Sequence, residues 1–211
     1  NIILKTLKPE TYNKIAAELS SKDINKISAK YKLAGKDLIK ALKEGGYILY
    51  IRHAMKTDTG IRKALDLVYG VTKTKFKPVG MPEGLCLNEE GEVASWLLGK
   101  VINHLEIPIG EVIASPICRC VQTAEIAFGR VDNTNVNLVY DKLWVNLDSI
   151  LVNEGKKNLF LSTISSGKNK VIVAHKELVI KSLNVDIEIE ESATAIFKIV
   201  DGKAHLVSIM T

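Results

Sequence analysis

The chain has 211 residues, of which 46% are hydrophobic and 25% charged, and its formal net charge is +5. This is enough apolar material for one substantial core, and no apolar run reaches the roughly 18–20 residues that a membrane-spanning helix needs. Residues 1–44 hold ten lysines against five acidic residues, whereas residues 45–211 are balanced. Because the excess charge belongs to the N-terminal segment and no stripe of aromatic residues interleaves it, a nucleic-acid-binding face on the rest of the chain is disfavoured.

The N-terminal segment is expected to be helical. Apolar residues recur at helical spacing over 9–19 and again over 33–42, and Gly45-Gly46 then breaks the pattern before the first strand. We interpret residues 1–44 as a helical extension packed on a single domain formed by residues 45–211. Its lysine-rich polar face is expected to be solvated, and contact with an anionic membrane is the alternative.

The remainder alternates between strand-like and helical segments. Strands are expected over 46–51, 111–114, 136–140 and 170–174, helices over 87–105, 117–128 and 153–165, and a terminal hairpin over 194–200 and 205–210 around Asp201-Gly202. A long loop over 56–86, rich in turn residues, follows the first strand. This alternation is typical of an α/β fold.

Two of the four histidines stand directly after predicted strands. His53 follows the run 46–51 together with Arg52, His175 follows 170–174, and Arg119 comes shortly after a third strand. Open α/β sheets bind their ligands at the carboxyl ends of the strands. Two histidines and two arginines converging there predict a pocket for a phosphoryl group.

Arginine usage supports this prediction. Only four of the 29 basic residues are arginine, namely Arg52, Arg62, Arg119 and Arg130. In a chain that uses lysine for generic charge, arginine stands out where a bidentate fork is needed, as on phosphate oxygens. Ordinary ion pairs are the alternative for Arg52 and Arg119. Arg62, in the long loop, is a further candidate for binding the substrate phosphate.

These residues carry a family resemblance. Arg-His-Ala at 52–54 resembles the Arg-His-Gly signature of the histidine phosphatase (phosphoglycerate-mutase-like) superfamily. The segments 87–91, 115–124 and 171–175 are similar to its later motifs, in the expected order, so the resemblance spans about residues 44–209. It implies a three-layer α/β/α sandwich with a mostly parallel central sheet, here preceded by a helical extension.

The resemblance also implies an activity, hydrolysis of a phosphomonoester through a phosphohistidine. His53 would be the nucleophile, while Arg52, Arg119 and His175 would bind the phosphoryl oxygens. Such an imidazole must be in the right tautomer. No cofactor or metal is required, and the chain contains no metal-ligand spacing such as Cys-x-x-Cys. The expected partner is a phosphorylated substrate, whose identity and the oligomeric state are left open.

Two positions depart from the superfamily pattern. Ala54 stands where glycine is usual, a small-for-small change. Lys176 stands where glycine often follows the second histidine, so it either narrows the pocket or adds a substrate phosphate contact.

The acid that protonates the leaving oxygen is less clear in the sequence. The glutamate that many members carry after the second arginine motif is missing between 132 and 150. Other branches place an acid just after the second histidine, and Glu177 matches that place. The alternative for Glu177 is a first-turn helix residue, in which case the candidates are Asp58, Asp132, Asp141 and Asp148.

The three cysteines relate to the cellular compartment in which the protein is expected to work. The sequence resembles secreted bacterial members with one cysteine before the helix at 87 and one immediately before the second arginine. The resemblance implies a disulfide between Cys86 and Cys118 and a periplasmic or secreted protein. Three reduced thiols, with Cys120, in a cytoplasmic protein are the alternative. The start at Asn1 is compatible with removal of a signal peptide or with trimming.

Two other functions are kept beside the phosphatase. A non-catalytic protein that binds a phosphorylated ligand is favoured by the missing glutamate and disfavoured by Glu177. A phosphomutase is less favoured, because the segment 52–58 lacks the longer signature of phosphoglycerate mutases.

Overall fold

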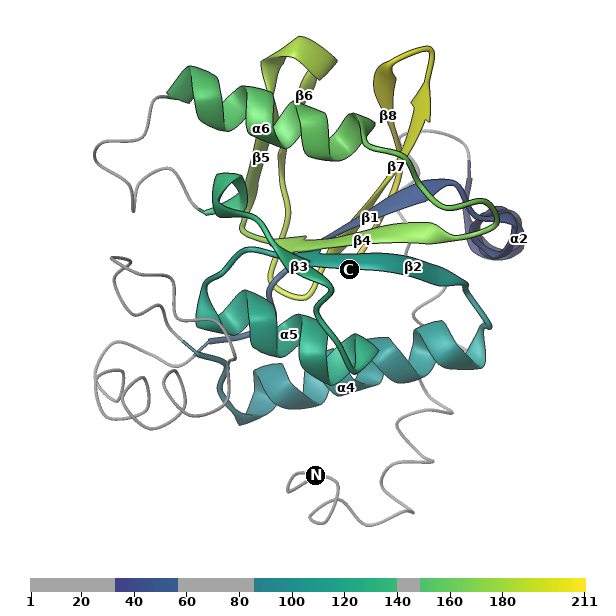
Figure 1. The fold of residues 1–211 in the computed structure, drawn as a ribbon. Helices are drawn as coiled ribbons and strands as arrows, with labels where there is room; N and C mark the ends of the chain where they lie inside the picture. The colour runs from purple at the N-terminus through teal and green to yellow at the C-terminus, as the bar shows by residue number, and fades with distance from the viewer. Residues whose placement is uncertain (1–32, 57–85, 140–148) are drawn as a thin grey trace.

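The computed structural model describes residues 33–56, 86–139 and 149–211 (Figure 1). At its centre is a six-stranded sheet in the order β3-β2-β4-β1-β7-β8. The strands are β1 (Tyr47–Arg52), β2 (Ile109–Ala114), β3 (Asn133–Thr134), β4 (Asn169–Ala174), β7 (Thr194–Val200) and β8 (Lys203–Met210). The helix predicted over 9–19 and most of the loop over 56–86 lie outside the described residues.

The strands that carry the site motifs are parallel neighbours. β4 pairs in parallel with β1 on one side and β2 on the other, and β2 pairs in parallel with β3. Arg52 stands opposite Ala174, and Ala114 opposite Val173, so these three strands end at one edge. In this sheet the antiparallel pairs are β1 with β7 and β7 with β8, and β7 and β8 form the predicted terminal hairpin. Asp201 and Gly202 both have positive φ, 50° and 70°, as a two-residue hairpin turn of this kind requires.

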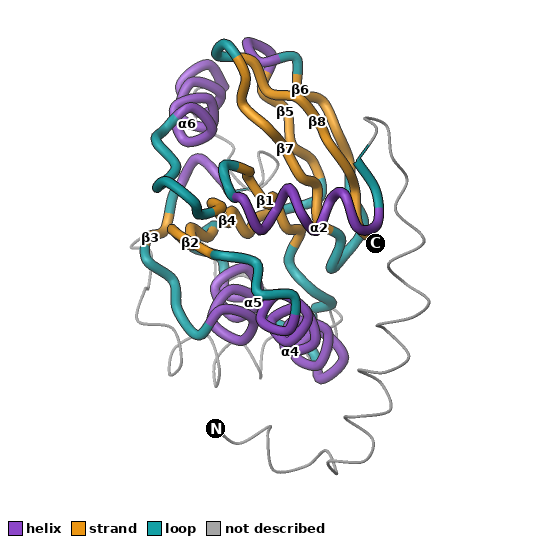
Figure 2. The backbone as a smooth tube through the Cα atoms, turned by 90° about the vertical axis from the view of Figure 1, so that its right-hand side faces the viewer, coloured by secondary structure: helices purple, strands orange, loops and turns teal. Residues whose placement is uncertain are grey.

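The sheet is covered on both faces, and the side chains of β1 alternate between the two layers. Leu49 and Ile51 belong to a core cluster with residues of α4 (Glu89–His104) and α5 (Cys118–Phe128). Ile48 and Tyr50 belong to a second cluster with Phe160 of α6 (Ser149–Leu161). Figures 1 and 2 show α4 and α5 on one side of the sheet and α6 on the other. The predicted three-layer α/β/α arrangement is confirmed.

The helix α2 (Gly35–Glu44) precedes the sheet. Leu38 and Leu42 are each 1% exposed and belong to the same core cluster as Leu49, so this helix packs on the domain. Gly45 ends it with φ 81°, and a Cβ there would meet the backbone at Gly167 and Lys168, 2.6 Å away. None of the described helices is both long and apolar enough to span a membrane.

Two of the predicted elements differ in the structure. The segment expected as a strand over 136–140 contains a short 3-10 helix, η4 (Val136–Leu138), because the Asn135 side chain accepts a hydrogen bond from the Asn137 N–H and turns the chain. The helix expected over 153–165 is α6, which ends at Leu161.

The end of α6 has a cause that lies far away in the sequence. Lys170 of β4 is 1% exposed, and its ammonium donates to the carbonyls of Leu159 and Ser162 at 3.3 and 2.8 Å. A buried cation at a helix C-terminus satisfies the last carbonyls and favours termination there. The pattern of apolar residues in the helix does not indicate this contact, so it could not predict where the helix ends.

The third difference concerns Glu177. It begins strand β5 (Glu177–Ile180), which pairs with β6 (Val185–Glu188) in an antiparallel hairpin outside the main sheet. The interpretation of Glu177 as a helix-start residue is therefore wrong. Valine and isoleucine recur through this segment and favour strands, and Asn184, at φ 54°, closes the turn after η6 (Lys181–Leu183).

Candidate active site

His53 is placed by the end of β1. Its backbone N–H donates to the Ala174 carbonyl at 3.0 Å, which continues the pairing of β1 with β4 by one residue. The ring is 3% exposed, and its Nδ1 lies 2.8 Å from the Ala54 carbonyl oxygen. A carbonyl only accepts hydrogen bonds, so Nδ1 carries the proton and Nε2 keeps its lone pair. Burial and the charge of Arg119 lower the pKa of His53 to about 3, so the ring is neutral at pH 7.

His175 occupies the equivalent place after β4. Its Nδ1 lies 3.2 Å from Nη2 of Arg119, and its Nε2 lies 3.0 Å from Oγ of Ser115. A guanidinium only donates, so Nδ1 accepts and Nε2 carries the proton. Burial, with the charge of Arg119, lowers the pKa of His175 to about 2. The Tyr50 hydroxyl donates to the His175 carbonyl at 3.1 Å and fixes the backbone there.

Arg119 lies in the first turn of α5. It is 8% exposed, and Thr123 one turn later connects it to the His53 loop: the Thr123 hydroxyl donates to the Arg119 carbonyl at 2.7 Å and accepts from the Ala54 N–H at 3.1 Å. The positive end of the α5 dipole adds to the guanidinium charge. Gln122 accepts from the Leu87 N–H at 2.8 Å and so joins α5 to the segment that precedes α4.

A disulfide bond lies at the same end of α5. Cys86 and Cys118 are bonded, with their Cα atoms 4.9 Å apart, next to Arg119. The remaining thiol, Cys120, is fully buried and donates to the Ala174 carbonyl at 3.4 Å. Burial raises the pKa of Cys120 to about 12, so it is a protonated packing residue beneath His175.

Arg52 is engaged by the turn before β7. Its Nη1 donates to the Ile189 carbonyl at 3.0 Å, and its Nη2 donates to Glu191 at 3.2 Å. Glu190 lies 3.9 Å from Nη1. The buried Nε of Arg52 has no acceptor among the described residues. Sequence reasoning missed Glu191, because nothing in its local sequence indicates that its turn meets Arg52.

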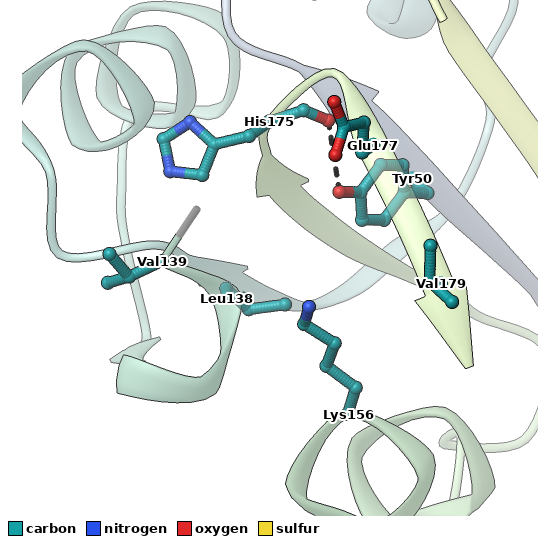
Figure 3. A pocket seen from close by; sticks show the side chains of 7 residues that line it. All are labelled: Tyr50, Leu138, Val139, Lys156, His175, Glu177 and Val179. Carbon is teal, nitrogen blue, oxygen red and sulfur yellow. Dashed lines mark hydrogen bonds between the residues drawn. The ribbon is translucent and has the colours of Figure 1, made fainter. Parts of the chain in front are cut away.

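A small cavity opens beside His175 (Figure 3). Apart from His175, its lining residues are Tyr50, Leu138, Val139, Lys156, Glu177 and Val179. Glu177 therefore lies on the same cavity as the second predicted phosphoryl ligand. Lys156 was not predicted, since one of two adjacent lysines in a helix carries no distinguishing signal.

The other predicted site residues lie elsewhere. Lys176 forms an ion pair with Glu188 of β6, and its side chain is 45% exposed. Asp132 pairs with Arg130 and accepts from the Val112 N–H at 2.8 Å, which is a structural role at the start of β3. The predicted substrate ligand Arg62 and the alternative acids Asp58, Asp141 and Asp148 lie outside the described residues.

The assembled groups suit a tetrahedral oxyanion. Two neutral imidazoles lie edge to face with their ring centroids 5.5 Å apart, one with a lone pair on Nε2 and the other with an Nε2–H, beside Arg119 at a helix N-terminus. Within the described residues, no group of three or more His, Cys, Asp or Glu side chains is arranged to hold a metal ion.

Solved structures share this fold. The protein histidine phosphatase SixA complexed with tungstate matches with a TM-score of 0.53 and 15% sequence identity, over 78% of this chain and 96% of its own. The ecdysone phosphate phosphatase from Bombix mori, also in complex with tungstate, matches with a TM-score of 0.52 and 13% identity, over 76% and 91%. The product of an open reading frame from Mycobacterium tuberculosis matches with a TM-score of 0.50 and 17% identity, over 78% and 96%.

The chain thus has the fold of histidine phosphatases, as its motifs predict. No protein-family profile and no curated protein sequence matches it.

Proposed function

We propose that this protein is a phosphatase that hydrolyses a phosphomonoester through a phosphohistidine on His53. The observation that carries the proposal is the hydrogen bond between Nδ1 of His53 and the Ala54 carbonyl, which directs the lone pair to Nε2. An imidazole in this tautomer is a nucleophile at neutral pH without a separate base. The fold shared with phosphatases that bind tungstate, a tetrahedral oxyanion, supports the same function.

The groups around His53 suit the charge of the transition state. Arg119 and the Nε2 proton of His175 would bind phosphoryl oxygens, the latter by exchanging Ser115 for the substrate. The buried Nε of Arg52, without an acceptor among the described residues, is a further donor for a phosphoryl oxygen. Phosphoryl transfer depends mostly on such positioning and electrostatic stabilisation.

Two steps complete the reaction. In the first, Nε2 of His53 attacks phosphorus, the P–N bond forms, the P–O bond to the leaving group breaks, and Glu177 gives its proton to the leaving oxygen. In the second, water attacks phosphorus while Glu177 takes one of its protons, the P–N bond breaks, and inorganic phosphate is released. Glu177 is placed in this role because it lies on the cavity beside His175.

A protein that only binds a phosphorylated ligand is the second candidate. One observation favours it: Nη1 and Nη2 of Arg52 already donate to Ile189 and Glu191. Such a protein would bind inorganic phosphate or vanadate but release no product from phosphate esters.

The test is to trap the intermediate. Wild-type protein incubated with a ³²P-labelled aryl phosphate and quenched in alkali should carry an acid-labile label, which His53→Ala should lose together with turnover. His104→Ala is the matched control, because His104 is an exposed residue at the end of α4. Turnover retained by His53→Ala would refute the phosphohistidine, and phosphate binding without turnover by wild type would favour the second candidate.

We further propose that the protein works in an oxidising compartment, periplasmic or extracellular. The support is the disulfide between Cys86 and Cys118, since such bonds persist where thiols are not kept reduced.

A further inference from the structure

The turn between β6 and β7 connects the two loops that carry the candidate catalytic histidines. It consists of residues 189–193, and we call it the β6–β7 turn. At its start, the Ile189 N–H donates to the carbonyl of Lys176, the residue after the second histidine, at 3.0 Å. At its end, the Ala193 carbonyl accepts from the Arg52 N–H, also at 3.0 Å. The turn is therefore hydrogen-bonded to both histidine loops.

The backbone of this turn has a conformation that its sequence does not favour. Ser192 has φ 66°, in the left-handed region that is uncommon for a residue with a Cβ. Its N–H donates to the His53 carbonyl at 3.3 Å, and the Ala193 N–H donates to the Glu190 carbonyl at 3.0 Å. Such conformations persist where the surrounding structure determines them, and they cluster at functional sites. The shape of the turn is thus held against the loop of the first histidine.

The side chain of Arg52 is held at its end by the same turn. Its Nη1 donates to the Ile189 carbonyl at 3.0 Å, and its Nη2 donates to the Glu191 carboxylate at 3.2 Å. The buried Nε has no acceptor among the described residues. A guanidinium is planar and has five N–H donors in a rigid arrangement. Hydrogen bonds to both Nη atoms therefore also fix the direction of the Nε–H.

Two neighbouring glutamates of the turn differ in their relation to Arg52. The Glu191 side chain is 28% exposed and accepts the hydrogen bond from Nη2, whereas that of Glu190 is 85% exposed and lies 3.9 Å from Nη1, beyond hydrogen-bond distance. A carboxylate repels a phosphoryl group and offsets part of the guanidinium charge. A favourable effect of Glu191 on the site would thus come from orienting Arg52, not from charge.

We infer that Glu191 is a positioning residue, which holds the Arg52 guanidinium so that its Nε–H faces the phosphoryl group at His53. Glu191 acts through Arg52 and does not itself contact the substrate. The inference rests on the proposed function, which brings the phosphoryl group to His53. Orientation matters because a donor stabilises the transition state only when it points to the place where charge develops.

Two substitutions of Glu191 separate the hydrogen bond from the charge. Glu191→Gln keeps an acceptor oxygen at the same reach but removes the charge, whereas Glu191→Asp keeps the charge and shortens the side chain. Glu191→Gln should keep kcat/KM for 4-nitrophenyl phosphate within about threefold of wild type, whereas Glu191→Asp and Glu191→Ala should lower it about tenfold or more, as the loss of a charge-assisted hydrogen bond does. A role of the charge alone would give the opposite order.

The neighbouring glutamate and Arg52 itself supply the controls. Glu190→Ala removes an adjacent charge without a hydrogen bond to Arg52 and should behave as wild type. In an Arg52→Ala background, Glu191→Ala should cause no further loss, because a residue that acts through Arg52 has nothing left to position. An equal loss in both backgrounds, wild-type or higher activity of Glu191→Ala, or the opposite order of Gln and Asp would overturn the inference. The comparison of Gln with Asp also covers the case in which Glu191→Ala does not fold.

Binding of vanadate separates this inference from the proposed function, because it needs no turnover. Titrated calorimetrically into the full chain, vanadate should bind about tenfold more weakly to Glu191→Ala and nearly as tightly to Glu191→Gln as to wild type. This pattern in a protein that hydrolyses no phosphate ester would keep the positioning role and reject the phosphatase. Hydrolysis by wild type, with every Glu191 variant equal to it, would keep the phosphatase and reject the positioning role.

Discussion

His53 and His175 lie edge to face across two parallel strands, with their ring planes at 67° and their centroids 5.5 Å apart. Their hydrogen bonds assign them opposite tautomers: His53 has its proton on Nδ1, toward Ala54, and His175 has its proton on Nε2, toward Ser115. One ring therefore keeps a lone pair on Nε2, whereas the Nε2–H of the other is hydrogen-bonded to Ser115. This division of roles suits an attack by the first imidazole on a phosphoryl group bound by the second.

Arg119→Lys should lower kcat/KM for an aryl phosphate by about 10²–10³-fold although the charge is kept. A lysine cannot donate to Nδ1 of His175 and bind a phosphoryl oxygen with the same planar fork. The measurement is steady-state hydrolysis of 4-nitrophenyl phosphate. Arg130→Lys, at an exposed arginine paired with Asp132, is the control and should behave as wild type. Near wild-type turnover of Arg119→Lys would show that Arg119 is structural.

Glu177→Gln should slow esters with poor leaving groups much more than esters with good ones. An alkyl alkoxide needs a proton as it leaves, whereas nitrophenolate hardly does, so the two rate losses should differ by about 10²–10⁴-fold. The rates compared are those for an alkyl phosphate and 4-nitrophenyl phosphate. Glu188→Gln is the matched control, because Glu188 stands opposite Glu177 in the hairpin and pairs with Lys176. Equal slowing of both esters would remove Glu177 from the role of general acid.

The free energy of unfolding should fall as the pH is lowered from about 6.5 toward 3. The pKa values of His53 and His175 are lowered from 6.5 to about 3 and about 2, so the unfolded chain takes up these protons first. The contribution of the two rings to the free energy of unfolding is fully present above pH 6.5. As the pH falls below that value, each ring loses up to about 1.4 kcal/mol of it per pH unit. Urea unfolding in phosphate-free buffer at pH 7, 6 and 5 measures this. His53→Gln should reduce the slope of the free energy of unfolding against pH by the contribution of one ring. An unchanged slope would contradict the low pKa of His53.

Replacement of both Cys86 and Cys118 by serine should lower the free energy of unfolding by about 3–4 kcal/mol, from the entropy of a loop of 32 residues. Denaturant unfolding of the oxidised protein and the double variant gives this difference. In protein isolated from its own compartment, mass spectrometry of non-reduced peptides should find the Cys86–Cys118 link and one thiol, Cys120. Three free thiols would instead place the protein in a reducing compartment.

The sequence by itself was sufficient to predict that the candidate catalytic residues lie together at one edge of the sheet. The strands that precede His53, Arg119 and His175 are short apolar runs, and buried parallel strands must be apolar on both faces. The carboxyl ends of such strands meet, so the neighbourhood of these residues follows from local patterns and connection rules. The hairpin at Asp201-Gly202 was equally predictable, because its turn has a local signature.

Only the tertiary structure decided the rest. The end of α6 is set by a hydrogen bond from Lys170. The Arg52 guanidinium donates to Glu191, and Lys156 forms part of the cavity wall. Each of these is a charged residue whose partner or cavity lies far away in the sequence, and a lysine or glutamate looks the same locally whether it is solvated or buried against such a partner. Glu177 illustrates the same limit, since pairing with β6 places it in a strand where local features also suited a helix start. The physical reason is that periodicity reports which face of an element is buried, whereas the neighbour of a polar group is set by the packing of the whole chain.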